Sequence, residues 1–434
     1  MKQTVISMLL AGFISIPAIA QSAFEEINAN PALAAGKYYA YQAPETSLTP
    51  APEGYTPFYI STFARHGSRY LTKKKKYDVP LSILREAAQR NQLTADGKRA
   101  LSIIEKLAAE AEGRYGELTP KGAQQHRELI QRMYANYPQV FSNGTHVDAR
   151  STYKTRAFLS MAAACVELKG LNPQLTITTD ASEHDAYYIK YKNPTYEEMH
   201  LANADSVYRA ADSVYVHPQR LMKQLFVEPD SVKNPVQLMQ DLFELDGISQ
   251  SSYQQKDLSF LFTPRERYDL WQRNNFEWYY EKGASPLSGS CMYKLERNLL
   301  KNFIETADTV IASKKNCVTL RYGHDTNLAP LAALMGINKL TCATTDWQKI
   351  ADTYRTYRII PMCGNIQLIF IQLIFFRKPG NDDILVKILL NEREVTLPVD
   401  TDMAPYYHWK DVYNYWMQVE KNIQLPVAVS KSDD

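Results

Sequence analysis

The sequence predicts an α/β fold, in which a three-layer α/β core is interrupted by a mainly helical inserted cap domain. Short segments rich in β-branched and aromatic residues alternate with helical segments early and late in the chain, whereas helical stretches dominate residues 185–300. Alternating strands and helices are typical of a sheet covered by helices, and the helical run indicates an insertion. Because ligands of such folds bind at the carboxyl ends of strands, we expect the site between core and insertion.

Composition supports a globular chain without a strong overall charge. Of 434 residues, 45% are hydrophobic and 22% are charged, which excludes wholesale disorder. Lys plus Arg (49) against Asp plus Glu (47) leaves a net charge of +2. A balance this close to neutral gives no general attraction to nucleic acid or to anionic lipid, so we expect neither partner.

The first twenty residues predict a cleavable signal peptide. Lys2 supplies a positive start, residues 5–16 are mostly apolar, and an A-x-A site ends at Ala20. The apolar run is too short to span a bilayer comfortably, so a membrane anchor is the weaker alternative. We expect a periplasmic or secreted protein that begins at Gln21 and has no membrane span.

Four segments follow from these patterns. Residues 1–20 are the signal peptide, and residues 21–54, which contain several prolines, predict an extended lead-in. The α/β core is expected in residues 55–180 and 301–434, with the mainly helical cap insertion in residues 181–300.

Individual elements are predicted by periodicity and by capping residues. Thr119 followed by Pro120 is typical of an N-cap and of the first position of a helix. The other expected core elements are strands at 58–64, 146–149, 175–178, 316–322 and 359–377, and helices at 81–110, 154–168 and 328–335. Helices of the insertion are expected at 196–216, 235–245 and 264–280, and from 293 onward.

A tandem repeat lies in the last predicted strand. Ile-Gln-Leu-Ile-Phe at 366–370 is followed directly by the same five residues at 371–375. Because five is odd, equivalent residues of the two copies face opposite sides of a strand. Only a strand buried on both faces tolerates this exchange, so the repeat predicts a central strand.

Five cysteines remain after cleavage, and an odd number leaves at least one unpaired. Cys342 with Cys363 is the best candidate for a disulfide, and buried free thiols throughout are an equal alternative. No Cys/His spacing typical of zinc is present, and we expect no metal and no cofactor.

A cationic motif follows the first predicted strand. In Arg65-His66-Gly67-Ser68-Arg69, two guanidinium groups suit bidentate recognition of phosphate, and His66 could accept a phosphoryl group. Neighbouring positive charge lowers the pKa of a histidine and keeps it neutral, as a nucleophile must be. One such motif is weak evidence, because a strand-end turn with solvated arginines has the same residues.

Two further segments strengthen the prediction of a phosphoryl-transfer site. Arg150 and Arg156 flank the start of a helix, where backbone N–H groups favour anions. His324 and Asp325 follow another strand and glycine; His324 could bind phosphate, and Asp325 could protonate the leaving oxygen.

These motifs together resemble those of the histidine acid phosphatases, the second branch of the histidine phosphatase superfamily, which includes phytases and multiple inositol polyphosphate phosphatases. The resemblance extends from about residue 55 to residue 377. It is carried by residues 65–69, 118–122, 150–152 with Arg156, and 324–327.

The resemblance implies a role for each matching residue. His66 would be the nucleophile and Asp325 the proton donor. Arg65, Arg69 and Arg156, together with His324, would hold the phosphate.

Some positions depart from the family pattern. Leu71 stands where a proline is frequent, and Asn193 replaces the cysteine of a Cys-Pro pair, so the family's usual disulfides do not transfer. His324-Asp325 matches many phytases and broad acid phosphatases, whereas the inositol polyphosphate subgroup commonly has His-Ala-Glu.

Two segments have competing interpretations. His184-Asp185 is a second His-Asp pair, but it has no preceding glycine and no capped helix after it, which favours His324-Asp325 as the donor pair. Lys73, Lys74, Lys75 and Lys76 are either a solvated run or a basic substrate rim.

The sequence therefore predicts an exported histidine acid phosphatase. It would hydrolyse phosphomonoesters through a phosphohistidine intermediate, with phytate and other inositol polyphosphates as substrates. A broad-specificity acid or sugar-phosphate phosphatase is the alternative. From another class, a catalytically inactive periplasmic polyanion-binding protein would have the same arginines. The sequence leaves the oligomeric state open.

Overall fold

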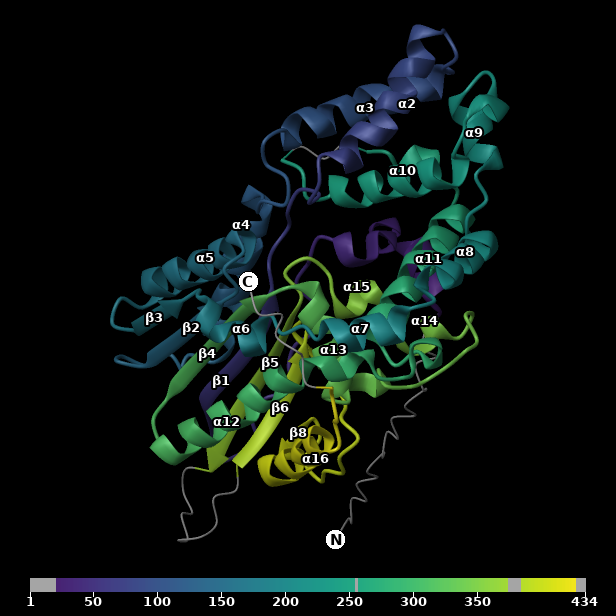
Figure 1. The fold of residues 1–434 in the computed structure, drawn as a ribbon. Coiled ribbons are helices and arrows are strands. Elements are labelled where there is room, and N and C mark those ends of the chain that lie inside the picture. Colours follow the sequence, from purple (N-terminus) through teal and green to yellow (C-terminus); the bar gives the residue numbers. More distant parts are fainter. Residues whose placement is uncertain (1–20, 254–256, 374–383, 427–434) are drawn as a thin grey trace, which may run out of the picture.

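A mixed β-sheet and a helical domain beside its carboxyl edge make up the computed structural model of the chain (Figure 1). The structure describes residues 21–253, 257–373 and 384–426. The signal peptide predicted for residues 1–20 and the last two residues of the tandem repeat lie outside these ranges.

The strand order places the ends of distant segments side by side. The order is β3-β2-β4-β1-β5-β6-β7, and β8 pairs with β6. The bounds are β1 Tyr55–Arg65, β2 His146–Ser151, β3 Thr176–Asp180, β4 Cys317–Gly323, β5 Asn365–Leu373, β6 Ile384–Leu390, β7 Arg393–Glu394 and β8 Tyr406–His408. Strands β1 to β4 are parallel, whereas β5 runs antiparallel to β1 and to β6. The carboxyl ends of β1, β2 and β4 therefore share one edge, as expected.

Helices cover both faces of the sheet, which confirms the three-layer α/β core. One face packs against α4 (Pro120–Asn136) and α5 (Thr155–Leu171) through a buried cluster that includes Ile60 and Met133. The other face packs against α12, α13 and α16, and Phe63 lies in that cluster. The bounds of these three are Arg297–Ser313, Asp325–Leu334 and Trp409–Lys421.

Strand β5 is a central strand, as the tandem repeat predicts. Ile366 and Leu368 lie in the buried cluster on one face, and Ile369 and Ile371 lie in the cluster on the other. The first residues of the two copies, Ile366 and Ile371, thus face opposite sides. Burial on both faces is what allows an odd-numbered repeat in a strand.

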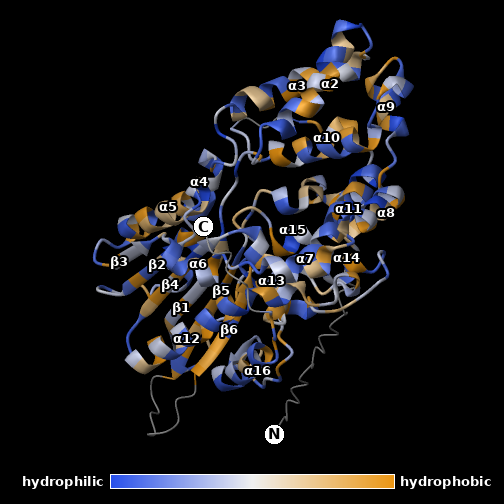
Figure 2. Cartoon of the chain, viewed as in Figure 1, coloured by the Kyte–Doolittle hydropathy of each residue, from blue (hydrophilic) through white to orange (hydrophobic). Residues whose placement is uncertain are grey.

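Two separate stretches of the sequence form the helical domain. Residues 181–300 form α7 (Pro194–Leu201), α8 (Ala204–Tyr215), α9 (Gln219–Leu225), α10 (Pro235–Ser249) and α11 (Pro264–Lys282). In Figure 2 these helices carry both hydrophobic and hydrophilic residues, whereas β6 is largely hydrophobic. The single helix predicted for 196–216 is divided between α7 and α8.

Helices α2 (Lys75–Gln89) and α3 (Ala95–Ala111), which lie within residues 55–180, pack with α9 and α10. Leu84 and Ile104 are buried in one cluster with Leu225 and Leu242, far along the chain. Their amphipathic pattern predicts helices correctly, but it does not say which apolar surface covers them.

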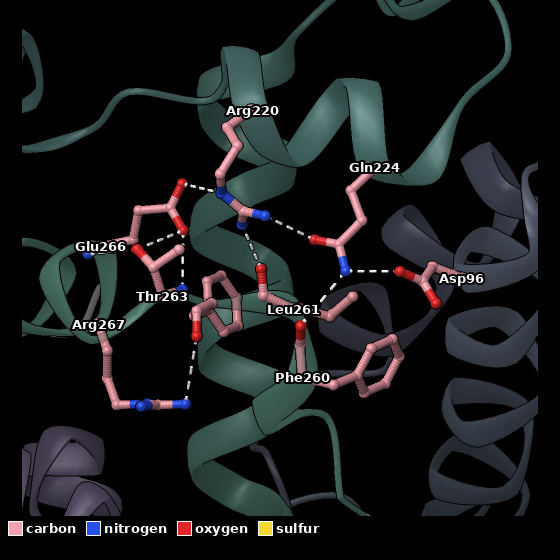
Figure 3. A network of polar contacts seen from close by, with 9 residues as sticks. Asp96, Arg220, Gln224, Phe260, Leu261, Thr263, Glu266 and Arg267 are labelled. Atoms are coloured by element: carbon pink, nitrogen blue, oxygen red, sulfur yellow. Dashed lines mark hydrogen bonds and ion pairs between the residues drawn. The ribbon is translucent and has the colours of Figure 1, made fainter.

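A polar network fixes the two parts of the helical domain to each other (Figure 3). Arg220 of α9 donates hydrogen bonds to Glu266 at 2.6 Å and to Gln224 at 2.8 Å. Gln224 in turn donates to Asp96 of α3 at 2.7 Å. Glu266 also forms the capping box of α11 with Thr263. One network thus joins α3, α9 and α11.

Part of the lead-in, predicted to be extended, is helical. It forms α1 (Ala23–Ala29) and the 3-10 segment η1 (Pro31–Tyr38), and only the part after η1 is extended. The buried Glu26 carboxylate pairs with Arg355 at 2.8 Å and accepts a hydrogen bond from Tyr357 at 2.6 Å. Pro31 marks the start of a helical segment, where proline is tolerated, so it does not exclude helix.

Short helical segments complete the chain. They are α6 Ala186–Ile189, α14 Ile350–Thr353, α15 Thr356–Ile359, η2 Glu183–Asp185, η3 Pro229–Ser231, η4 Ser259–Leu261, η5 Pro286–Ser288, η6 Met292–Glu296 and η7 Ile337–Lys339. Within the described ranges, no helix combines the length and apolarity that a bilayer crossing requires.

All five cysteines lie in described segments as free thiols, so the Cys342–Cys363 disulfide is wrong. Cys342 is exposed, whereas Cys363 is buried with its sulfur 3.7 Å from Nδ1 of His126. Export permits a disulfide but does not place two thiols within bonding distance.

Candidate active site

Parallel pairing of β1 with β4 brings the two histidine motifs together. Arg65 at the end of β1 is opposite Gly323 at the end of β4. The His66 backbone N–H donates a hydrogen bond to the Gly323 carbonyl at 3.0 Å. The rings of His66 and His324, which lie one residue beyond each strand, have centroids 5.6 Å apart.

The loop after β1 is held against the start of α4. Thr119 is the N-cap of α4, as predicted, and its side chain accepts from the Gly122 N–H at 3.2 Å. A Cβ on Gly67 would lie 2.3 Å from the Gly122 carbonyl oxygen, and one on Gly122 would lie 2.2 Å from the Ser68 carbonyl oxygen. Both positions therefore require glycine for close backbone approach.

The His66 ring is held in one tautomer. Its Nδ1 lies 2.9 Å from the Gly67 carbonyl oxygen, which can only accept, so Nδ1 carries the proton. Nε2 then has a free lone pair. Burial, followed by the charges of Arg65, Arg156 and Arg69, lowers the pKa of His66 well below its usual value. The ring is therefore neutral and has the form a nucleophile requires.

Three arginines surround this ring from different elements. Arg65 ends β1 and is fully buried, and its Nη1 donates to the carbonyl groups of Lys37 and Ile360, both at 2.6 Å. Arg156 lies in the first turn of α5. Burial lowers the pKa of Arg65 and of Arg156 to about 10, so both stay charged at neutral and acid pH.

Several buried donors of these residues have no hydrogen-bond partner within the described part of the chain. They are Nε of Arg65, Arg69 and Arg156, and the polar ring atom Nδ1 of His324. Leaving a buried charged donor unpaired costs on the order of 1–3 kcal/mol or more. Unpaired donors from several guanidinium groups around His66 fit a bound oxyanion, whose oxygens can accept from all of them.

Asp325 is the first residue of α13 and lies against Arg65. Its Oδ2 is 2.7 Å from Nη2 of Arg65. Burial alone would raise the pKa of Asp325, but the charges of Arg65, Arg69 and Lys37 outweigh it and hold that pKa well below its usual value. The carboxylate is therefore ionised without a ligand.

Two buried contacts fix the segment that carries His324 and Asp325. His324 Nε2 lies 3.1 Å from the Thr152 hydroxyl. Asn327, in the first turn of α13, donates to the carboxyl group of Glu296 at 3.1 Å. Burial raises the pKa of Glu296 well above its usual value, so its acid is neutral and adds no negative charge beside the site.

The structure thus brings together all six residues that the motifs indicate. They are Arg65, His66, Arg69, Arg156, His324 and Asp325.

The remaining candidates lie elsewhere. Asp185 of the second His-Asp pair is 3.8 Å from Arg150, which also pairs with Asp148 at 2.9 Å and Asp180 at 3.2 Å. The guanidinium of Arg150 is therefore paired with carboxylates beside β3. Unlike Arg65, Arg69 and Arg156, it has no unpaired buried Nε in the described segments.

The four lysines have different surroundings. Lys74 pairs with Glu112 at 2.7 Å on an exposed surface, and Lys76 pairs with Glu244 of α10. Lys73 and Lys75 are exposed.

Sequence reasoning missed residues of the lead-in and of the cap. Lys37 contacts Arg65, and Tyr38 contacts Arg69. Trp278 lies against Lys37, and Glu244 accepts a hydrogen bond from Tyr38. The charge of Lys37 acts on Asp325. The one sequence feature that could have indicated them is Gly36, directly before Lys37. In the structure Gly36 has a φ of 55°, and a Cβ at this position would lie 2.9 Å from the Thr356 hydroxyl oxygen. A single glycine in a proline-rich segment does not identify a site.

Comparison with known proteins identifies the family. The family model described as histidine phosphatase superfamily (branch 2) matches residues 60–391. The chain belongs to this family. As a member it is a phosphatase, and its fold class agrees.

Related proteins agree over most of the length. The human multiple inositol polyphosphate phosphatase 1 is 23% identical over 463 aligned positions, which cover 95% of this chain and 89% of the human one. The multiple inositol polyphosphate phosphatase of Bifidobacterium longum superposes with a TM-score of 0.70 at 21% identity, covering 87% of this chain and 96% of that one. A phytase from D. castellii superposes with a TM-score of 0.64 at 14% identity, covering 89% and 85%.

No group of three or more His, Cys, Asp or Glu side chains that could hold a metal is found in the described segments.

Gly122→Ala tests whether the contact between the loop and α4 holds the site. The new methyl group would overlap the Ser68 backbone, so we expect destabilisation of about 1–3 kcal/mol and a loss of activity on an aryl phosphate. Gly170→Ala in α5, where a Cβ meets nothing within 4 Å, is the matched control and should retain activity. Thermal unfolding and rate measurements check both; equal behaviour of the two variants would contradict the assignment.

Proposed function

We propose that this phosphatase is exported and hydrolyses inositol polyphosphates, including phytate, through a phosphohistidine intermediate. One observation carries the mechanism: the neutral His66 ring has a free Nε2 among unpaired donors of Arg65, Arg69 and Arg156. The names of the human and Bifidobacterium longum relatives support the substrate class.

In the first step, Nε2 of His66 attacks phosphorus in line. The N–P bond forms as the ester P–O bond breaks, and the three arginines stabilise charge on the nonbridging oxygens. Asp325 gives its proton to the departing alcohol oxygen. This step leaves a phosphohistidine and an ionised Asp325.

In the second step, water attacks phosphorus while the Asp325 carboxylate takes its proton. The O–P bond forms, the N–P bond breaks, and His66 regains its neutral ring as inorganic phosphate leaves. One carboxyl group thus acts first as acid and then as base, and the cycle closes without any other proton carrier.

Substrate binding supplies the condition for the first step. In the free protein, Asp325 is ionised because it faces Arg65 and neighbouring cations. A phosphate dianion bound to those cations neutralises them and adds negative charge beside the carboxylate, which raises its pKa. Protonation of Asp325 is therefore coupled to binding, and acid conditions favour it.

Two alternatives remain within reach of experiment. His324-Asp325 is the pattern of many phytases and broad acid phosphatases, so a wider substrate range that includes sugar phosphates is one alternative. A protein that binds polyanions without reacting would share the arginines but would not need the unprotonated Nε2 of His66 or the carboxyl group of Asp325.

Export is supported by the contacts of the residues that follow the predicted cleavage site. Ser22 caps α1 immediately after the predicted cleavage site, and the Gln21 carbonyl accepts a hydrogen bond from Arg355 at 3.1 Å. The predicted mature end is thus fixed to the fold, so cleavage after Ala20 would not disturb it.

His66→Ala tests the nucleophile. We expect the wild-type protein, in EDTA, to release phosphate from phytate, glucose 1-phosphate and an aryl phosphate, with the highest kcat/KM for phytate. The variant should lose several orders of magnitude on all three, because no other group can form the intermediate. His146→Ala, on the exposed end of β2, is the control.

Labelled substrate followed by denaturation in alkali, in which phosphohistidine survives, should mark His66 alone. Full turnover by the variant would refute the nucleophile, and no release by the wild type would favour the binding protein. Equal kcat/KM values on all three substrates would favour the broad phosphatase.

Asp325→Asn tests the proton donor. With an alkyl phosphate we expect a loss of about 10²–10⁴-fold, because the alcohol must be protonated as it leaves. With an aryl phosphate the loss should be much smaller, since a phenolate leaves readily. The low pKa of free Asp325 means that wild-type activity on the alkyl phosphate falls as pH rises. Asp346→Asn, on an exposed residue, is the control; equal losses on both esters would reject the assignment.

Expression with residues 1–20 in a Gram-negative host tests export. The protein in the periplasmic fraction should begin at Gln21, as shown by N-terminal sequencing. Ala20→Arg should block processing because the cleavage site requires a small residue, whereas Ile19→Leu, at the middle position, should not. Uncleaved protein in the cytoplasm in all three cases would contradict export.

A further inference from the structure

Lys37 is a cation beside the catalytic pocket that the mechanism leaves unused. Its half-buried side chain places Nζ 5.3 Å from the ring centroid of Tyr38 and 5.4 Å from that of Trp278. No ion pair of Lys37 is found within the described part of the chain. The two aromatic faces attract the ammonium but offer no oxygen, so its N–H donors stay available.

The position of Lys37 relative to the catalytic groups is fixed by its backbone. Its carbonyl oxygen accepts from Nη1 of Arg65 at 2.6 Å, on the guanidinium that also holds Asp325. Its charge is among those that lower the pKa of Asp325. Lys37 therefore lies on the side of the pocket from which the proton donor acts, and the alcohol leaves on that side.

The other cation on this side already has a carboxylate. Glu244 pairs with Lys76 and accepts a hydrogen bond from the Tyr38 hydroxyl at 2.5 Å. The Tyr38 ring also lies 5.6 Å from the Arg69 guanidinium. This network fixes the aromatic support under Lys37. Glu244 forms its ion pair with Lys76 and interacts with Lys37 through charge without an ion pair, so the N–H donors of Lys37 stay available for a second anion.

We infer that Lys37 binds a second phosphate group of the substrate, carried by the leaving alcohol. The inference rests on the proposed function and assigns a residue to its preference for polyphosphorylated substrates. The three arginines hold the phosphoryl group being transferred, and the rest of the molecule extends past Asp325 toward Lys37. A phosphate there would form a charge-assisted hydrogen bond with an ammonium that is already oriented.

The test compares Lys37→Met with the wild type on myo-inositol hexakisphosphate and myo-inositol monophosphate. Methionine keeps the apolar stem against Tyr38 and Trp278 but removes the charge. Because the charge of Lys37 also acts on Asp325, both rates are measured over a pH range. We expect the ratio of kcat/KM for the hexakisphosphate to kcat/KM for the monophosphate to fall about 10- to 100-fold. Lys37→Arg should retain much of the selectivity.

Lys301→Met is the matched control, because it removes the same charge from an exposed site on α12. It should leave both substrates unaffected, which separates a local contact from general attraction between the protein and a polyanion. Binding measured by calorimetry gives an independent readout. Lys37→Met should weaken the binding of inositol hexasulfate about 10- to 100-fold, whereas the affinity for inorganic phosphate should change much less.

Other outcomes would overturn the inference. Equal losses on both inositol substrates, or a shift of the pH profile without a change in selectivity, would make Lys37 a positioning residue for Asp325. Unchanged binding of the hexasulfate would remove the second anion contact. The proposed function has its own test: it fails if the wild-type protein releases no phosphate or if His66→Ala stays active. In either case, the calorimetric measurement of hexasulfate binding still decides whether Lys37 binds a second anion.

Discussion

The parallel pairing of β1 with β4 is the constraint on which the site depends. The register that places Arg65 opposite Gly323 sets His66 and His324 one residue beyond the same edge of the sheet. Because both strands are buried on both faces, a shift of either by one residue would turn its apolar side chains to the wrong cluster. Core packing thus fixes the geometry of the site residues, which lie at strand ends, at helix starts and in the short loops that join them.

The cost of this arrangement is a concentration of positive charge away from water. Arg65 is buried, and Arg156 is largely so, with little carboxylate nearby except Asp325. Asp325 stabilises the unliganded site by pairing with Arg65, and a phosphate would replace it in that role. In the proposed mechanism, the ion pair between Arg65 and Asp325 stabilises the site before substrate binds. When a phosphate pairs with Arg65 instead, Asp325 can take up the proton that it donates.

The sequence predicted those features of the fold that depend on neighbouring residues or on burial of a strand. The strand ending at Arg65, the Thr119 cap of α4 and the central position of β5 each depend on neighbouring residues or on burial of both faces. The motifs also indicated the six residues that converge. The position of α2 and α3 was missed because an amphipathic helix does not specify its partner, and Lys37 was missed because only tertiary contacts bring it to Arg65.

The division between core and cap explains why the motifs predict chemistry better than substrate. The proposed nucleophile, the proposed proton donor and the arginines around them belong to strand ends and helix starts of the core, whose geometry the sheet imposes. Around them, Lys37 comes from η1, Lys76 from α2, Glu244 from α10 and Trp278 from α11, which are held together by apolar packing of helices. Helical surfaces tolerate exchange of polar residues more readily than a buried sheet does. Selectivity can therefore change among relatives while the catalytic edge stays the same.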